Sequence, residues 1–268
     1  MAGSYTVTVT DANACTLDST FTITEPTALV TNRAITDVLC NGDATGAIDI
    51  TPSGGAGGYT FSWSTGATTE DVSGLVAGSY TVTVTDANAC TLESTFTLTE
   101  PTALVTNRAI TDVLCNGDAT GAIDITPSGG AGGYTFSWST GATTEDISGL
   151  VAGSYTVTVT DANACTLDST FTITEPTALV TNRAITDVLC NGDATGAIDI
   201  TPSGGAGGYT FSWSTGATTE DISGLVAGSY TVTVTDANAC TLDSTFTVTE
   251  PTAFVTNRAI TDVLCNGD

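Results

Sequence analysis

The chain has 268 residues, of which 41% are hydrophobic, and its 29 acidic residues far outnumber its 4 basic ones. The formal net charge of −25 argues against a nucleic-acid-binding protein and against adhesion to anionic membranes, while the apolar content is too high for a disordered acidic tail. Histidine is absent, which removes the usual acid–base group of neutral pH and the commonest metal ligand.

An internal repeat of 75 residues organises the sequence. The stretch that begins at Gly3 returns almost unchanged from Gly78, Gly153 and Gly228. We predict the closing strands of an incomplete repeat at 1–25, three β-sandwich repeats at 26–100, 101–175 and 176–250, and the opening strand of a further incomplete repeat at 251–268. We expect a section of a longer array, and we detect neither a signal peptide nor an apolar run approaching the ~20 residues of a membrane helix.

Each repeat has the alternating pattern of half-buried strands. In the first whole repeat, Tyr80, Val82 and Val84 alternate with threonines, and Phe96 and Leu98 do the same further on. We predict strands near residues 28–39, 47–51, 59–64, 71–75, 79–85 and 91–99. Glycine-rich "PSGGAGG", polar "STGATTED" and the tight turn "DANA" separate several of them.

Short antiparallel strands at this spacing predict an all-β protein, a tandem array of small immunoglobulin-like (PKD-like) β-sandwich domains that forms an elongated rod. Pro101 should end the last strand of its repeat because it cannot donate to a continuing ladder. No glycine- or serine-rich linker follows, so we expect close coupling between consecutive domains. The predicted core of the first whole repeat is Ile48, Ile50, Tyr59, Phe61, Trp63, Leu75, Tyr80, Val82, Val84, Leu92, Phe96 and Leu98.

One long motif fills the centre of each whole repeat, in the first copy from Cys40 to Cys90. It contains C-x-G-x-x-x-G-x-I, then Y-x-F-S-W-S-x-G-A-T-T, and it ends in A-G-x-Y-x-V-x-V-T-D-A-N-x-C. This motif resembles the SprB-type repeat of Bacteroidetes cell-surface proteins. The resemblance implies large adhesins that are exported by the type IX secretion system and, in some cases, take part in gliding motility. The departure is Ala89, where the family pattern has glycine.

The eight cysteines suggest disulfides rather than a metal site, because no C-x-x-C spacing occurs. We favour pairing within each repeat, which would join Cys40 to Cys90, Cys115 to Cys165 and Cys190 to Cys240. In a six-stranded sandwich the two cysteine loops would share one end. In a seven-stranded sandwich they would lie at opposite ends, and pairing between repeats, Cys40 to Cys165 and Cys115 to Cys240, becomes the alternative. Pairing across the linker, as in Cys15 to Cys40, and buried free thiols are further alternatives.

No catalytic constellation stands out, and we predict neither an enzyme nor a cofactor. Calcium is the one cofactor we consider, with Asp43, Asp86 and Asn88 as weak candidates because they offer oxygen ligands in loops. No EF-hand loop is present, and the favoured interpretation is that these residues form Asx turns.

We predict a structural repeat segment of a long cell-surface adhesin or filament, an extracellular acidic stalk for surface attachment that also serves gliding in some members. The alternative is a secreted matrix or glycan-binding protein in which Tyr59, Phe61 and Trp63 form a stacking platform; binding of ordered water by threonine rows is a third. The expected partners are neighbouring repeats, other copies in a filament or bundle, and a surface or glycan ligand bound elsewhere. Neither nucleic acid binding nor membrane insertion is expected.

Overall fold

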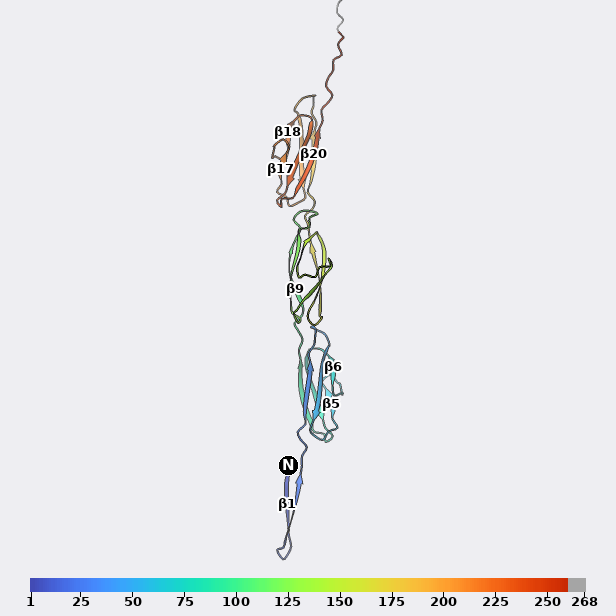
Figure 1. The fold of residues 1–268 in the computed structure, drawn as a ribbon, viewed down its shortest axis with the longest axis vertical. Coiled ribbons are helices and arrows are strands. Elements are labelled where there is room, and N and C mark those ends of the chain that lie inside the picture. The colour runs from blue at the N-terminus through green and yellow to red at the C-terminus, as the bar shows by residue number, and fades with distance from the viewer. Residues whose placement is uncertain (260–268) are drawn as a thin grey trace, which may run out of the picture. The chain divides into compact units, whose positions relative to one another are not determined.

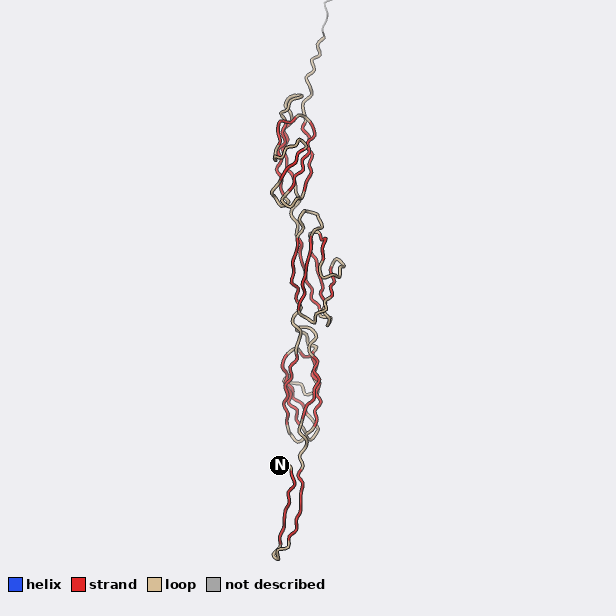
Figure 2. Tube along the Cα trace, turned by 60° about the vertical axis from the view of Figure 1, so that its left-hand side comes forward, coloured by secondary structure: helices blue, strands red, loops and turns tan. Residues whose placement is uncertain are grey.

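The structure, a computed structural model, describes residues 1–259, and every described segment is strand or loop (Figure 2). The chain begins with a hairpin of β1 (Gly3–Thr10) and β2 (Thr16–Ile23). The first whole repeat contains β3 (Val30–Thr36), β4 (Gly46–Ser53), β5 (Thr60–Trp63), β6 (Val72–Leu75), β7 (Gly78–Thr85) and β8 (Thr91–Leu98). Among these described residues there is no helix long and apolar enough to cross a membrane.

The same six strands recur in the next two repeats. In the second they are β9 (Val105–Thr111), β10 (Gly121–Ser128), β11 (Thr135–Trp138), β12 (Ile147–Leu150), β13 (Gly153–Thr160) and β14 (Thr166–Ile173). In the third they are β15 (Val180–Thr186), β16 (Gly196–Ser203), β17 (Thr210–Trp213), β18 (Ile222–Leu225), β19 (Gly228–Thr235) and β20 (Thr241–Val248). All six strands predicted for the first whole repeat are therefore present, with ends shifted by a few residues.

Each repeat is a sandwich of two three-stranded antiparallel sheets (Figure 1). The first whole repeat has the strand orders β3-β4-β6 and β5-β7-β8, and the third has β15-β16-β18 and β17-β19-β20. The small immunoglobulin-like sandwich that the strand pattern predicted is confirmed. The strand orders and the packing of the two sheets define this fold.

The strand directions within a sandwich decide which loops share an end. Strand β4 runs antiparallel to both β3 and β6, and β7 runs antiparallel to both β5 and β8. Strands β3 and β8 finish at the same end, because the backbone N–H of Val38 donates to the carbonyl of Thr99 at 3.0 Å. Strands β5 and β6, although consecutive, therefore run in the same direction.

The core lies between the two sheets and contains most of the residues predicted for it. In the first whole repeat the buried cluster is Ile48, Ile50, Trp63, Val72, Leu75, Val82, Val84, Phe96 and Leu98. Tyr59, Phe61 and Tyr80 are only partly buried against this cluster, and Leu92 is also intermediate. Val72 and Val38, which we did not predict, are buried as well.

Polar groups of the core residues have partners. The Trp63 indole N–H donates to the Thr69 carbonyl at 2.9 Å, and the Tyr80 hydroxyl donates to the Val76 carbonyl at 2.9 Å. The single arginine of the repeat, Arg33, lies on the edge strand β3 with its guanidinium 5.6 Å from the centre of the Phe96 ring. A cation over the aromatic face is attracted by the ring quadrupole, and a charge on an edge strand opposes pairing with another sheet.

The hairpin β1–β2 is a two-stranded sheet, and within residues 1–259 no second sheet covers it (Figure 1). Its strands pair through all eight positions, from Gly3 opposite Ile23 to Thr10 opposite Thr16. Its apolar side chains stay exposed, among them Val7 at 50% and Phe21 at 58%. The closing strands that we predicted in 1–25 thus form on their own, without a core.

The chain forms two compact units, and each contains one complete sandwich. The first unit comprises Met1–Asn107, Thr126–Ser137 and Thr158–Asp168. The second comprises Arg108–Ile125, Trp138–Val157 and the described residues from Ser169 onward. Residues of the second repeat belong to both units, so the predicted domain boundaries at 26, 101 and 176 stay predictions. The opening strand expected in 251–268 does not form within residues 251–259, and residues 260–268 lie outside the described part.

Candidate functional site

Two disulfides join consecutive repeats, and they define the candidate site of this chain. Cys40 pairs with Cys165 and Cys115 pairs with Cys240, each with Cα atoms 5.6 Å apart and a sequence separation of 125. The Cα separation is ordinary for a disulfide. The favoured prediction of pairing within each repeat is wrong, and the alternative pairing between repeats is the one that the structure contains.

The predicted pairing was wrong because the connection from β5 to β6 does not reverse the direction of the chain. We assumed that a six-stranded sandwich reverses the chain at every connection, which would place both cysteine loops at one end. Because β5 and β6 run in the same direction, Cys40 follows β3 at the end where β8 finishes, whereas Cys90 lies in the β7–β8 turn at the opposite end. A cysteine that follows the opening strand of a repeat, such as Cys40, therefore meets a cysteine of the closing turn only in the next repeat, where it is Cys165.

Three of the remaining cysteines are free and exposed. They include two predicted disulfide candidates, Cys90 and Cys190, together with Cys15. Cys265 lies outside the described residues.

The loop that carries Cys40 is fastened to the linker of its own repeat. The carboxylate of Glu100 accepts hydrogen bonds from the backbone N–H of Gly42 at 2.7 Å and from the side-chain amide of Asn41 at 3.0 Å. The same amide also donates to the carbonyl of Pro101 at 3.1 Å. In the second repeat Gly117 donates to Glu175 at 2.7 Å, and Asn116 donates to the carbonyl of Pro176. The loop and the linker are therefore held as one surface.

The turn that carries Cys165 is organised by Asp161, which is only 5% exposed. Its carboxylate accepts backbone hydrogen bonds from Ala131 at 2.8 Å and from Asn163 and Cys165 at 2.9 Å each. Burial opposes the charged form, but these donors, with Ala131 the strongest, lower the pKa of Asp161 below its ordinary value of 3.8. The carboxylate joins the β13–β14 turn to the glycine-rich loop of the same repeat.

The glycine-rich loop approaches this carboxylate too closely for any side chain. A Cβ added to Gly130 would lie against Oδ2 of Asp161, and Gly130 also has a positive φ of 57°. Its backbone N–H donates to the carbonyl of Thr102 in the linker at 2.8 Å. The loop "PSGGAGG" thus has glycine here because backbone and carboxylate meet directly.

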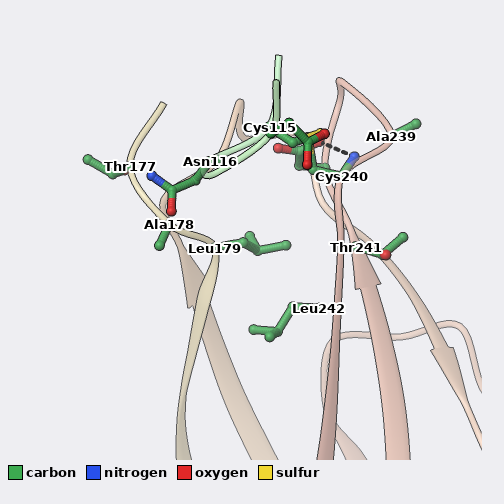
Figure 3. Close-up of a pocket in the computed structure, with 12 residues that line it drawn as sticks. Cys115, Asn116, Thr177, Ala178, Leu179, Ala239, Cys240, Thr241 and Leu242 are labelled. Atoms are coloured by element: carbon green, nitrogen blue, oxygen red, sulfur yellow. Dashed lines mark hydrogen bonds between the residues drawn. A yellow bond between two sulfur atoms is a disulfide. The ribbon is translucent and has the colours of Figure 1, made fainter. Parts of the chain in front are cut away.

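Besides the disulfide and the bond from Gly130 to Thr102, a side-chain hydrogen bond joins the two surfaces. The side-chain amide of Asn163 donates to the carbonyl of Leu39 at 3.1 Å, and Asn238 donates to Leu114 at 3.1 Å in the second joint. The second disulfide borders a hollow of about 420 Å³, lined by Asn116, Ala178, Leu179 and Leu242 among others. Figure 3 shows these side chains and the disulfide. The identical contacts in the two units establish a repeated joint.

Sequence reasoning missed the residues that build this joint apart from its cysteines. Glu100, Asn163 and Gly130 each recur every 75 residues, but so does nearly every other residue. Near-identical copies hide the functional positions. The one available signal was the acidic residue directly before each linker proline, which is Glu100 in the first whole repeat.

The turn residue that departs from the family pattern is strained. Ala89, Ala164 and Ala239 have φ values of 62°, 65° and 64°, in the left-handed region that glycine adopts at little cost. The resemblance implied glycine here, and the backbone gives the physical reason.

The calcium candidates do not come together within one repeat. Asp43 lines the hollow of the first joint along with Asp161 of the next repeat, whereas Asp86 lines a separate hollow beside Cys90. The Asp86 carboxylate accepts backbone hydrogen bonds from Ala56, Asn88 and Cys90, as an Asx-type turn requires. Within the described part of the chain, no group of three or more His, Cys, Asp or Glu residues could hold a metal ion.

Comparisons with solved structures find tandem immunoglobulin domains. A three-domain titin fragment shares 10% identity at a TM-score of 0.36, and the match covers 86% of this chain and 100% of that one. The N-terminal eight domains of Down Syndrome Cell Adhesion Molecule give 9% and 0.39, with 93% and 43% covered. Extracellular domains 3–5 of Drosophila OTK give 12% and 0.29, with 84% and 92% covered.

A search of curated proteins finds no significant match. The family model described as "SprB repeat" matches three times, at residues 32–68, 107–143 and 182–218. Each match runs from the opening strand through the joint loop to the polar loop that follows the tryptophan. The resemblance noted in the sequence is thereby confirmed: three segments of the chain match the SprB repeat, one in each whole repeat.

Proposed function

We propose that this chain is a structural segment of an extracellular, surface-attached adhesin, in which the repeats act as an acidic stalk. The observation that carries the proposal is the joint, present twice with the same disulfide and the same Asn-to-carbonyl hydrogen bond. A joint with both a peptide linker and a disulfide restricts hinge motion between neighbours. A stalk that holds a binding part away from a cell needs this property.

Charge supports the same role. Residues 26–100 contain eight acidic residues and one arginine, a net charge of −7 for the repeat. Such a surface stays hydrated and repels its neighbours, so lateral bundles of the stalk would require cations. The proposal also includes that the repeats form an elongated rod, that such rods can bundle, and that the protein can take part in gliding motility.

The family and the cysteines support an extracellular location. SprB repeats belong to cell-surface proteins, and structural disulfides persist in oxidising surroundings. The architecture supports a structural role, because the polar residues of the joint hold backbone groups.

The alternative, a glycan-binding repeat, has less support. The proposed stacking platform needs an exposed Trp63, but that side chain is 3% exposed and packs against Phe96 with ring centres 6.0 Å apart. Trp138 and Trp213 are equally buried.

Immunogold electron microscopy of whole producing cells, with antibody to one repeat, tests the proposal. We expect gold particles along thin filaments that leave the cell surface. Label confined to the medium or matrix would favour the secreted alternative, and label confined to the cytoplasm would overturn an extracellular role. Cells lacking the protein provide the control.

A further inference from the structure

We infer that the two disulfides limit how far the chain can be stretched, by giving tension a covalent path that bypasses more than half of the residues. The inference goes beyond the proposed stalk, since it concerns the chain itself wherever it is displayed. Its basis is that the two bonds overlap in sequence: Cys115 lies between Cys40 and Cys165, and Cys165 lies between Cys115 and Cys240.

The overlap sends tension backwards through the middle repeat. A pull on the two ends follows the chain from residue 1 to Cys40 and crosses to Cys165. The shortest route then runs in reverse to Cys115, crosses to Cys240 and continues to residue 268. It contains 39 peptide links before Cys40, 50 in the middle repeat and 28 after Cys240, about 117 in all. The reduced chain has 267 links, so about 150 are bypassed.

The two complete sandwiches are loaded along a single strand each. In the first, β3 lies on the path while β4 to β8 do not, and β3 pairs with β4 through seven positions from Val30 opposite Ser53 to Thr36 opposite Ala47. In the third, β20 lies on the path and pairs with β19 through eight positions. Tension enters and leaves by the two ends of the same strand, so the backbone of that strand carries it and the neighbouring strand is not pulled past it.

Unfolding of the two complete sandwiches would add little to the distance between the two ends of the oxidised chain. A strand already rises about 3.3 Å per residue, close to the limit of a fully extended chain. The path through each complete sandwich consists mainly of such a strand, so unfolding of its other strands adds no length to the tether. Most of the available extension comes from the 50 links between Cys115 and Cys165.

Single-molecule force spectroscopy on the full chain tests the inference. The chain would be held by peptide tags at its two ends, after the free thiols of the oxidised protein have been alkylated. We expect the fully unfolded contour length to increase by roughly 500 Å when dithiothreitol reduces both bonds, at ~3.3–3.6 Å for each released residue. Equal contour lengths before and after reduction would overturn the proposal.

Cysteine variants separate this path from other pairings. Cys115→Ser should lengthen the oxidised chain by about 25 links, roughly 85 Å, because tension must then follow the chain from Cys165 onward. The matched control Cys190→Ser should change nothing, since that cysteine is free. Pairing within repeats would instead lengthen both variants by about 50 links, and this result would refute the inference. Circular dichroism establishes that each variant folds.

Discussion

Two hairpins of identical sequence occupy opposite environments in this protein. Gly3–Pro26 and Gly153–Pro176 agree at every position. Val7, Val9, Phe21 and Ile23 are 50–60% exposed, whereas Val157, Val159, Phe171 and Ile173 are 0–3% exposed. The difference teaches that the alternation of apolar and polar residues creates an apolar face on the hairpin. Burial of this face requires the second sheet.

Local geometry is the same in both hairpins. Asp11 accepts hydrogen bonds from Asn13 and Cys15 at 2.9 Å each, as Asp161 does from its own turn. Ala14 has a φ of 68°, close to that of Ala164. The β1–β2 hairpin therefore serves as a built-in control, in which each turn contact is present without the core.

The largest expected effect comes from truncation of the buried ring. Phe171→Ala should destabilise its sandwich by about 3–5 kcal/mol, because a cavity forms where the ring packs against Trp138. Phe21→Ala, at the identical position of the exposed hairpin, should change stability by less than about 0.5 kcal/mol. Denaturant unfolding followed by tryptophan fluorescence measures both. Similar losses would mean that the β1–β2 hairpin is covered in solution.

Acid should destabilise the turn that has the additional contact to the glycine-rich loop. The pKa of Asp161 is lower in the folded state, so its contribution is present above its ordinary value of 3.8 and is lost as the pH falls through the folded pKa. The melting temperature should drop below about pH 4. Asp161→Ala should lower the melting temperature at pH 7 and reduce this acid dependence, whereas Asp11→Ala should leave both unchanged. An unaltered acid profile in Asp161→Ala would contradict the assignment.

Relief of backbone strain should give a smaller, favourable effect. Ala164→Gly removes the Cβ from a left-handed position and should stabilise the second repeat by up to about 1 kcal/mol, raising its melting temperature by a few degrees. Ala14→Gly makes the same change where no core depends on the turn, and it should leave the melting curve unaltered. Differential scanning calorimetry compares the two. A lower melting temperature for Ala164→Gly would count against strain at this turn.

Calcium should not change the stability of the exposed β1–β2 hairpin or of the buried closing hairpins. The Asp86 carboxylate is already used by three backbone donors, which leaves the turn without a free ligand set. The melting temperature should be the same in calcium and in chelator. An increase with calcium that Asp43→Asn abolishes would restore the metal interpretation.

Sequence reasoning succeeded where local chemistry decides the outcome. Alternation of Val82 and Val84 with threonines placed strand β7 and its buried face, and the "DANA" turn separated β7 from β8. It failed for Tyr59 and Phe61, which are only partly buried because they lie toward the margin of the sandwich core. It missed Val38, which is buried although it follows its strand; its backbone N–H donates to Thr99, a residue distant in sequence that comes directly after β8.

The sequence by itself determined the 75-residue period, the six strands of each repeat, the turns and the resemblance to the SprB repeat, because each depends on neighbours in the chain. Only the tertiary structure decided which cysteines pair and which copy of an identical hairpin is buried. Pairing depends on the common direction of β5 and β6, which places Cys40 and Cys90 at opposite ends. Burial depends on whether a second sheet is present, and no residue within the hairpin encodes that.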